Sequence, residues 1–262
     1  MEKNYLPLSV VIITLNAAHG LWQTLQTVTT LTEDIVIVDS GSVDDTIMIA
    51  KQFGANVIYQ NWLGFGPQKQ FAVSQAKHDW VLCLDADEWL SDTLAESIRA
   101  ALQKSAYYAY TVSRSNRFLG RFLKYGEAYP DENLRLFHRQ YACWSNDLVH
   151  EKVLTSNRCP IGKLAGDLMH DSAESLDNYL KKQNRYTSIQ AEQMIELGEK
   201  ISIAKAIGSA LFRFIKGYFF RLGFLDGFAG FVHIVIASSN SFLKYTKAIA
   251  IRQNSKWLDA KK

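Results

Sequence analysis

Three carboxylates follow an apolar run in the N-terminal half of the chain. Residues 80–84 read Trp-Val-Leu-Cys-Leu, and Asp85, Asp87 and Glu88 come directly after them. Crowded carboxylates repel one another, so a shared cation is a natural partner. Hard divalent ions such as Mg²⁺ and Mn²⁺ take oxygen ligands and commonly bridge a carboxylate to a diphosphate. A motif this short also fits a solvated loop that caps the next helix, so its position along the chain must decide.

The surrounding pattern places this motif at the end of a strand. Strand-like runs alternate four times with helix-like segments, which predicts a doubly wound, mostly parallel α/β sheet. The carboxyl ends of such strands share one rim, where ligands bind. Asp39 ends the second run, so we expect it on the same rim as the motif. The predicted strands are 8–14, 34–39, 56–60 and 80–84, and the helices are 21–31, 42–54 (opened by a Ser42/Asp45 capping box), 67–77 (Pro67 first) and 91–105.

Composition changes twice along the chain and indicates three sections. Residues 1–105 form the α/β half, residues 106–174 read as an aromatic-rich mixed β insertion, and residues 175–262 read as a helical tail. The tail carries fourteen Lys/Arg against six Asp/Glu, about +8, although the net charge of the whole chain is +3. The sheet section is therefore acidic and the tail basic.

Three cysteines without metal-ligand spacing, Cys83, Cys143 and Cys159, argue against structural zinc and a disulfide framework. We expect a reducing, cytoplasmic compartment. The N-terminal residues lack the pattern of a signal peptide, and no nucleic-acid-binding motif is visible, so we expect no nucleic-acid partner.

Four motifs in order carry a family resemblance: "LSVVIITLNAAHGL", "DIVIVDSGSVDDT", "GFGPQKQFAVSQA" and "WVLCLDADEWL". Together they resemble an inverting family 2 glycosyltransferase of GT-A fold. "VHEKV" and the tail "FRLGFLDGFAGFVHIVIASSNSFLKY" more narrowly resemble bacterial enzymes that add glucose to heptose in the lipopolysaccharide inner core. The resemblance implies metal-dependent transfer of a hexose, glucose from UDP-glucose, to a hydroxyl of that core.

The resemblance also implies where the donor's nucleotide binds. Uracil and ribose would contact Thr14, Asn16 and Asp39, with Ser40 and Gly41 in the turn. Many relatives carry Glu where this chain has Asn16.

The remaining donor contacts follow from the same resemblance. Lys69 would lie by the nucleotide or its phosphates, and a solvated helix lysine is the open alternative. Asp85 would lie near the ribose and Asp87 on the Mg²⁺ or Mn²⁺ ion, with Glu88 orienting the site from behind. His170 is a candidate further metal ligand.

Inversion requires an acceptor hydroxyl to attack opposite the departing diphosphate while a carboxylate takes its proton. "NDLVHEKV" and "YPDENLRLF" supply the candidate carboxylates. The resemblance favours Glu151 as the base, with His150 beside it. An exposed Glu151 that merely pairs with Lys152 or Arg135 remains the alternative.

Arginines gather in the mixed β section, and their planar forks suit phosphate and carboxylate groups of an anionic acceptor. We expect Arg117, Arg135 and Asp131 to bind the acceptor, a lipid-linked oligosaccharide.

The tail residues 223–243 are apolar but interrupted by Asp226 and His233, unlike a clean transmembrane helix. One reading is an interfacial segment on the inner face of the cytoplasmic membrane. The other is a helix pair that buries itself against the domain or a second subunit, giving a homo-oligomer. The flanking cations are Arg213, Lys216, Arg221, Lys244 and Lys247.

Other functions remain to be weighed. A haloacid-dehalogenase-type phosphatase places Asp-x-Asp after the first strand, and a nucleotidyltransferase places a Gly-rich loop there; neither fits "LNAAHG". A family 2 transferase with another donor or acceptor, and a non-catalytic nucleotide-sugar-binding protein, remain open.

Overall fold

The computed structural model describes residues 5–259 except 105, 148–150, 157–158 and 173–174. The chain divides into two compact units. The first comprises Met1–Ser115 and Asp131–Ser172, and the second comprises Asn116–Pro130 and Ala173–Lys262.

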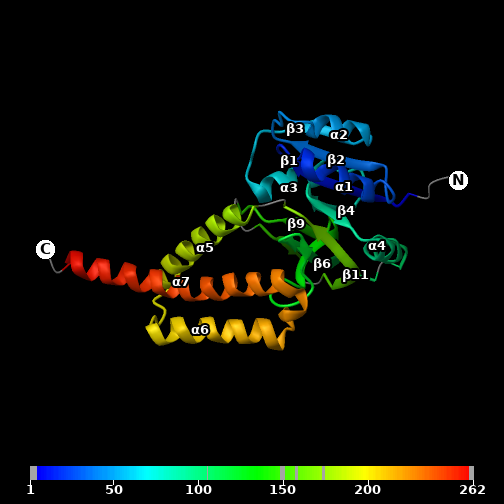
Figure 1. Ribbon diagram of the computed structural model, residues 1–262. Coiled ribbons are helices and arrows are strands. Elements are labelled where there is room, and N and C mark those ends of the chain that lie inside the picture. The colour runs from blue at the N-terminus through cyan, green and yellow to red at the C-terminus, as the bar shows by residue number, and fades with distance from the viewer. Residues whose placement is uncertain (1–4, 105, 148–150, 157–158, 173–174, 260–262) are drawn as a thin grey trace. The chain divides into compact units, whose positions relative to one another are not determined.

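The described strands form one large mixed sheet and one small sheet (Figure 1). The strand order of the large sheet is β3-β2-β1-β4-β8-β6-β11-β5, and β7 pairs with β6. Strands β1 to β4 are mutually parallel where they pair, whereas β8 joins β4 in the antiparallel sense. The large sheet contains β1 Leu8–Thr14, β2 Asp34–Asp39, β3 Asn56–Tyr59, β4 Trp80–Asp85, β5 Glu88–Leu90, β6 Ala109–Phe118, β7 Arg121–Phe122, β8 Asp131–His138 and β11 Ile161–His170; β9 Ala142–Trp144 and β10 Val153–Thr155 form the small sheet.

Both faces of the parallel strands are buried, as a continuous β-branched sequence requires. On β1, Val10 and Ile12 enter a core shared with Leu21 and Leu94, while Val11 enters a second core with Val73. The predicted GT-A-type α/β architecture with a mixed β insertion and a C-terminal helical segment is confirmed. The first core is covered by α1 Ala18–Val28, α2 Thr46–Gln52 and α4 Asp92–Lys104, and the second by α3 Phe65–Ser74.

Register brings the acidic strand ends together. Thr14 pairs with Asp39 at the end of β1 and β2, and Asp39 pairs in turn with Tyr59 of β3. On the other side of β1, Ile13 pairs with Asp85 at the end of β4. The shared rim predicted from the sequence is therefore present.

Three predicted helix starts are wrong. Helix α1 begins at Ala18, three residues before the predicted start at 21. Helix α2 begins at Thr46, because the Ser42 side chain hydrogen-bonds the Asp39 carboxylate and does not cap a helix. Helix α3 begins at Phe65, two residues before Pro67. Proline is tolerated anywhere in a first turn, since those N–H groups have no intrahelical acceptor.

The second unit is mainly helical. Helices α5 and α6 both pack along α7, and a short π-helical turn and a 3-10 turn join α6 to α7. Ser175 and Ser202 cap the first two helices by accepting hydrogen bonds from backbone N–H groups. The elements are α5 Leu176–Glu196, α6 Ile203–Ile215, η1 Lys216–Phe220, η2 Gly223–Asp226 and α7 Gly227–Asp259.

Substitution of Gly66 tests how tightly α3 packs. A Cβ atom at Gly66 would lie 2.1 Å from the Ser145 carbonyl oxygen and 2.7 Å from that of Asp147. Because both are backbone atoms, we expect Gly66→Ala to cost the upper part of the roughly 1–3 kcal/mol typical of overpacking. The exposed Ser74→Ala on the same helix should change stability by about 0.5 kcal/mol or less. Urea unfolding of both variants measures this, and equal stabilities would contradict the packing.

Candidate functional site

The loop after β2 is built on the Asp39 carboxylate, which is 1% exposed. Its Oδ1 accepts the backbone N–H groups of Gly41 (2.9 Å) and Ser42 (2.8 Å), and its Oδ2 accepts the Thr14 hydroxyl at 2.8 Å. Burial alone would raise the pKa of Asp39, but these hydrogen bonds and the one from the Ser42 hydroxyl lower it. The contacts favour a role in shaping the loop over a direct contact with a ligand.

Asn16 and Ser40 join this loop to its neighbours. Asn16 has φ of 51°, a left-handed conformation that asparagine tolerates, and its Oδ1 accepts the Val43 N–H at 2.9 Å. The Ser40 hydroxyl accepts from the Gln68 side chain at 3.0 Å. Gln68 is fully buried in α3 and also donates to the Gln60 carbonyl oxygen. The predicted nucleotide-side residues Thr14, Asn16, Asp39 and Ser40 are thus parts of one connected rim.

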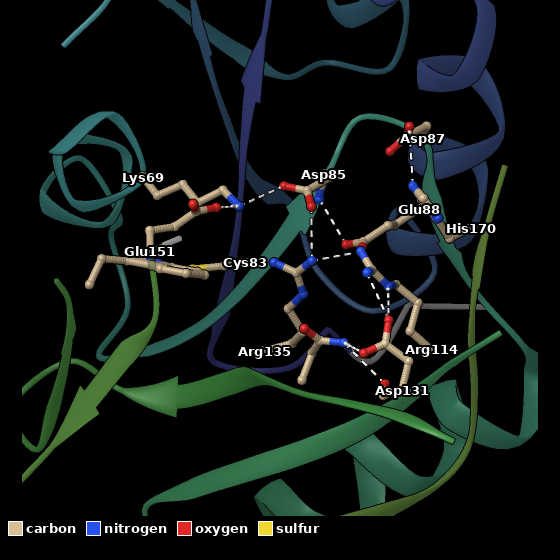
Figure 2. A network of polar contacts seen from close by, with 12 residues as sticks. Lys69, Cys83, Asp85, Asp87, Glu88, Arg114, Asp131, Arg135, Glu151 and His170 are labelled. Atoms are coloured by element: carbon tan, nitrogen blue, oxygen red, sulfur yellow. Dashed lines mark hydrogen bonds and ion pairs between the residues drawn. The ribbon is translucent and has the colours of Figure 1, made fainter. Parts of the chain in front are cut away.

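A chain of alternating charges runs through the strand ends (Figure 2). Each cation in it contacts two carboxylates, so that no neighbouring pair along it is of like sign. Four carboxylates and three cations take part. We call it the charge chain, and its members in order are Glu151, Lys69, Asp85, Arg135, Glu88, Arg114 and Asp131.

Arg135 is the most enclosed cation of the charge chain, with 5% of its side chain exposed. One guanidinium nitrogen lies 2.8 Å from Asp85 Oδ2 and 2.7 Å from Oε1 of the fully buried Glu88. Burial opposes ionisation of both Arg135 and Asp85, but their mutual attraction prevails. It raises the pKa of Arg135, and together with Lys69 it holds the pKa of Asp85 well below its ordinary value.

Lys69 links Asp85 to Glu151. Its Nζ lies 2.9 Å from Asp85 Oδ1 and 2.9 Å from Glu151 Oε1. The ammonium also sits 4.8 Å from the centre of the Trp144 ring, a cation–π contact. Lys69 is therefore a buried cation held by two carboxylates and an aromatic face. It is not the solvated helix lysine that the sequence left open.

Cys83 lies beneath this contact and takes no part in ionic chemistry. The Trp144 indole N–H donates to its sulfur at 3.3 Å, and burial raises the pKa of the thiol to about 12. A protonated thiol is a poor nucleophile, so Cys83 is unsuited to forming a covalent intermediate near neutral pH.

Asp87 differs from Asp85 in its surroundings. It follows β4 in the turn to β5, is 35% exposed, and its Oδ2 lies 3.4 Å from His170 Nε2 (Figure 2). Among the described residues, no group of three or more His, Cys, Asp or Glu side chains could hold a metal. One carboxylate and one imidazole still fit an ion such as Mn²⁺ that takes its other ligands from phosphates and water.

The turn that carries Asp87 is packed closely against α1. A Cβ atom at Gly20 would lie 2.9 Å from both the Ala86 carbonyl oxygen and the Asp87 Cα. The Thr24 hydroxyl donates to the same Ala86 oxygen at 3.0 Å. These contacts fix the direction in which Asp87 leaves the strand.

Comparison with known proteins identifies the family. The description "Glycosyl transferase family 2" matches residues 9–154, more than half of the chain. The chain belongs to glycosyl transferase family 2. The residues that it matches include the whole of the charge chain, so the glycosyltransferase carries its acidic rim within the family's own region.

Relatives of the glycosyltransferase match it along most of its length. An uncharacterized glycosyltransferase of Rickettsia typhi is 33% identical, over 92% of this chain and 86% of the relative. The lipopolysaccharide core biosynthesis glycosyltransferase LpsC of Rhizobium meliloti is 29% identical, over 92% of each. A solved structure of S. aureus TarS in complex with UDP has a TM-score of 0.49 and 15% identity, covering 94% of this chain and 91% of that one.

Several predicted site residues of the glycosyltransferase lie apart from this cluster or outside the described residues. His150 is not among the residues that the structure describes. Arg117 belongs to the second unit. Arg135 is buried, and one of its guanidinium nitrogens contacts both Asp85 and Glu88, so we propose that it positions Asp85. Asp131 ends the charge chain through Arg114, 2.7 Å away.

Residues that the sequence reading missed share one property: their partners are distant in sequence. Arg114 and Gln68 look like ordinary strand and helix residues, and Gly20 looks like part of a loop. Trp144 lies in a segment without a motif. The one available signal was the arginine in each of "YYAYTVSR" and "NLRLFHR", which places Arg114 in β6 and Arg135 in the neighbouring strand β8.

Removing the Arg135 charge tests the charge chain. Arg135→Met leaves Asp85 and Glu88 without their shared cation, and we expect the free energy of unfolding to fall by about 3–5 kcal/mol at neutral pH. Arg139→Met breaks the more exposed pair with Asp79 and should cost about 1 kcal/mol or less.

The same variant has a predicted pH dependence. The pKa of Asp85 is lowered in the folded glycosyltransferase, so its stabilising contribution is full above the ordinary value of 3.8 and is lost as pH falls below it. The stability difference between Arg135→Met and wild type should therefore narrow in acid. Urea titrations from neutral pH down to about pH 2 measure it; a stability difference that stays constant below the ordinary value of 3.8 would contradict ionic pairing.

Proposed function

We propose that this glycosyltransferase moves a hexose, glucose from UDP-glucose, to a heptose hydroxyl of the lipopolysaccharide inner core with inversion. The carrying observation is the Lys69 ammonium, which holds Glu151 and Asp85 at 2.9 Å each. The candidate base Glu151 and the strand-end carboxylate Asp85 thus contact the same ammonium group. The name of the LpsC relative supports the lipopolysaccharide core as acceptor.

The donor's nucleotide would bind at the rim of β1 and β2. Asp39 is saturated by the loop's own donors, so its part is to hold Ser40 and the Gly41 turn in shape. Thr14 and Asn16 border the same loop. Asp85, fixed by Arg135, faces the ribose side, and Lys69 lies where a diphosphate would be attracted.

The chemical step is a single displacement. The acceptor oxygen bonds to the anomeric carbon as the bond from that carbon to the diphosphate oxygen breaks, and the electron pair leaves with the diphosphate. Glu151 takes the hydroxyl proton, so no net charge is created at the acceptor. The Lys69 ion pair orients Glu151 until an anionic donor competes for the same ammonium.

A divalent metal ion fits beside this arrangement. Asp87 and His170 would hold Mg²⁺ or Mn²⁺, with the remaining positions open to phosphate and water. When bound, the ion would neutralise charge on the leaving diphosphate. Asp85 is a poor ligand by comparison, because Lys69 and Arg135 already occupy both of its oxygens.

The acceptor would be lipid-linked, which implies action at the inner face of the cytoplasmic membrane. Asp131 and Arg117 are the proposed acceptor contacts. A family 2 transferase with another sugar or acceptor uses the same residues and differs in pocket shape, so the donor must be tested directly.

A screen of nucleotide sugars tests the proposed donor. Thermal unfolding and donor hydrolysis would be measured with UDP-glucose, UDP-N-acetylglucosamine and GDP-mannose, each with Mg²⁺, Mn²⁺ or chelator. At a donor concentration 100 times its dissociation constant, stabilisation by about 2.7 kcal/mol is expected for UDP-glucose with metal only. A response to a different donor reassigns the sugar, and indifference to every donor defeats the proposal.

Glu151→Gln tests the base. The near-isosteric amide cannot accept the proton, so transfer in a single turnover should fall about 10²–10⁴-fold. Donor affinity, measured by calorimetry, should change little. Glu132→Gln is the matched control, since Glu132 is an exposed carboxylate paired with Lys163 and, like Asp131 and Asp147, is another candidate carboxylate of the two sequence motifs. Normal transfer by Glu151→Gln, or an equal loss in both variants, would end the assignment.

A further inference from the structure

The helices of the second unit pack with small residues inside. Along the contact of α6 and its following turns with α7, the buried positions include Ala206, Gly217, Gly223 and Ala229. A Cβ atom at Gly223 would lie 2.2 Å from Ile234 Cδ1, and one at Gly230 would lie 2.4 Å from the Gly223 carbonyl oxygen. The helices approach this closely because these side chains are absent.

Large apolar side chains face outward from the same elements. On α6, Ile203, Ile207, Leu211 and Ile215 recur every four residues and are all exposed. The stripe continues through the turns into α7. Its most exposed members are Phe220 of η1, 80% exposed, and Phe228 of α7, 75% exposed. We call this surface the outer face; its other members are Phe212, Phe219, Phe224, Leu225 and Phe231.

This distribution is the reverse of a water-soluble helix pair, which buries its large apolar residues. Small residues at the helix contact and large ones outside are typical of helices packed in lipid. Within the second unit these residues stay exposed, so the helix pair does not bury its large apolar side chains against itself.

The bend between the two helices is a fixed feature. Leu222 has φ of 56°, and the turn that follows it, η2, buries Asp226. The Asp226 carboxylate accepts the backbone N–H groups of Lys124 (2.9 Å) and Tyr125 (2.8 Å). Within the described residues no single helix is long and apolar enough to cross a membrane. The pair Ile203–Phe220 and Gly223–Gln253 passes that test together, bent by 74°.

The charged residues of the segment from 201 to 225 are all cations. From residue 201 to 225 the sequence holds four cations, Lys205, Arg213, Lys216 and Arg221, and no Asp or Glu. Arg213 pairs with Glu127, whereas Lys205, Lys216 and Arg221 are exposed among the apolar side chains. Such cations attract anionic headgroups while the phenylalanines enter the acyl boundary.

We propose that the outer face inserts into one leaflet of an anionic lipid membrane, with the Phe219–Phe228 bend as its deepest part. Residues at this bend would enter about 5–10 Å below the headgroups. Insertion of the outer face would explain the proposed location at the membrane. The residues that support it are separate from those proposed for the transfer reaction.

A second copy of the chain is a poorer occupant of this face. A two-fold dimer brings the same patch of both subunits together, so Lys205, Lys216 and Arg221 of both copies would gather in one interface. No acidic residue within 201–225 is available to compensate for them. An anionic leaflet supplies the missing charge.

Vesicle flotation of the full chain tests the proposal. We expect flotation with phosphatidylglycerol/phosphatidylethanolamine vesicles and at least tenfold weaker binding to phosphatidylcholine vesicles. Phe220→Ser/Phe228→Ser should weaken binding to the anionic vesicles at least tenfold, and Lys216→Glu/Arg221→Glu should do the same at low salt. The matched controls lie in the first unit: exposed Leu154→Ser/Ile161→Ser, and Lys51→Glu/Lys77→Glu for an equal change of charge.

Several outcomes would overturn the proposal: absence of wild-type flotation, equal flotation of the phenylalanine variant, or equal loss in the controls. Concentration-dependent dimerisation in sedimentation, abolished by Phe220→Ser/Phe228→Ser without lipid binding, would assign the face to a second copy instead. Thermal stabilisation by the donor should persist in every tail variant. Its loss from wild type would defeat the proposed reaction and leave the lipid result unaffected.

Discussion

The contact on which the site depends is the buried Arg135 guanidinium between Asp85 and Glu88. Two carboxylates three residues apart at the end of a buried strand would repel each other and be costly to bury ionised. One cation from an antiparallel neighbouring strand removes both difficulties, and the Glu88 carboxylate also accepts the Asp85 backbone N–H at 3.0 Å. The mixed β strands therefore complete the parallel half: β8 supplies the charge that allows β4 to end in acid.

This pairing divides the Asp-x-Asp motif into two kinds of carboxylate. Asp85 has both oxygens committed to cations and serves as a fixed point from which Lys69 reaches Glu151. Asp87 lies two residues further along the chain. Its carboxylate points to His170, and its side chain is slightly more exposed than that of Asp85. Their side chains are almost equally exposed, 30% and 35%, so it is pairing that distinguishes two identical residues, one as a positioning group and the other as the candidate ligand. Gly20 and Thr24 of α1 maintain the difference by fixing the backbone between them.

The sequence predicted the parts of this site that depend on local pattern. Continuous apolar runs predicted β1, β2 and β4, and the alternation with helices placed Asp39 and Asp85 on one rim, which register confirms. Contacts between distant residues were beyond such reasoning. Ser42 looked like a helix cap because a cap and an Asp39 hydrogen bond require the same hydroxyl. Lys69 and Glu151 are 82 residues apart, and only the folded chain shows that they share a contact.

Composition alone was also insufficient to predict which surface the helices of the tail present. Its apolar residues and cations were evident from composition, and composition could not separate a buried helix pair from a lipid-facing one, since both need the same residue types. What separates them is which residues the helices use to touch each other. Gly217, Gly223 and Gly230 occupy the closest part of the contact, and Phe231 borders it beside Phe214 and Tyr218, whereas Phe220 and Phe228 stay exposed. Close packing of the small residues therefore goes together with exposure of the large ones. The cations that flank the bend favour an anionic surface as the proposed partner of those exposed side chains.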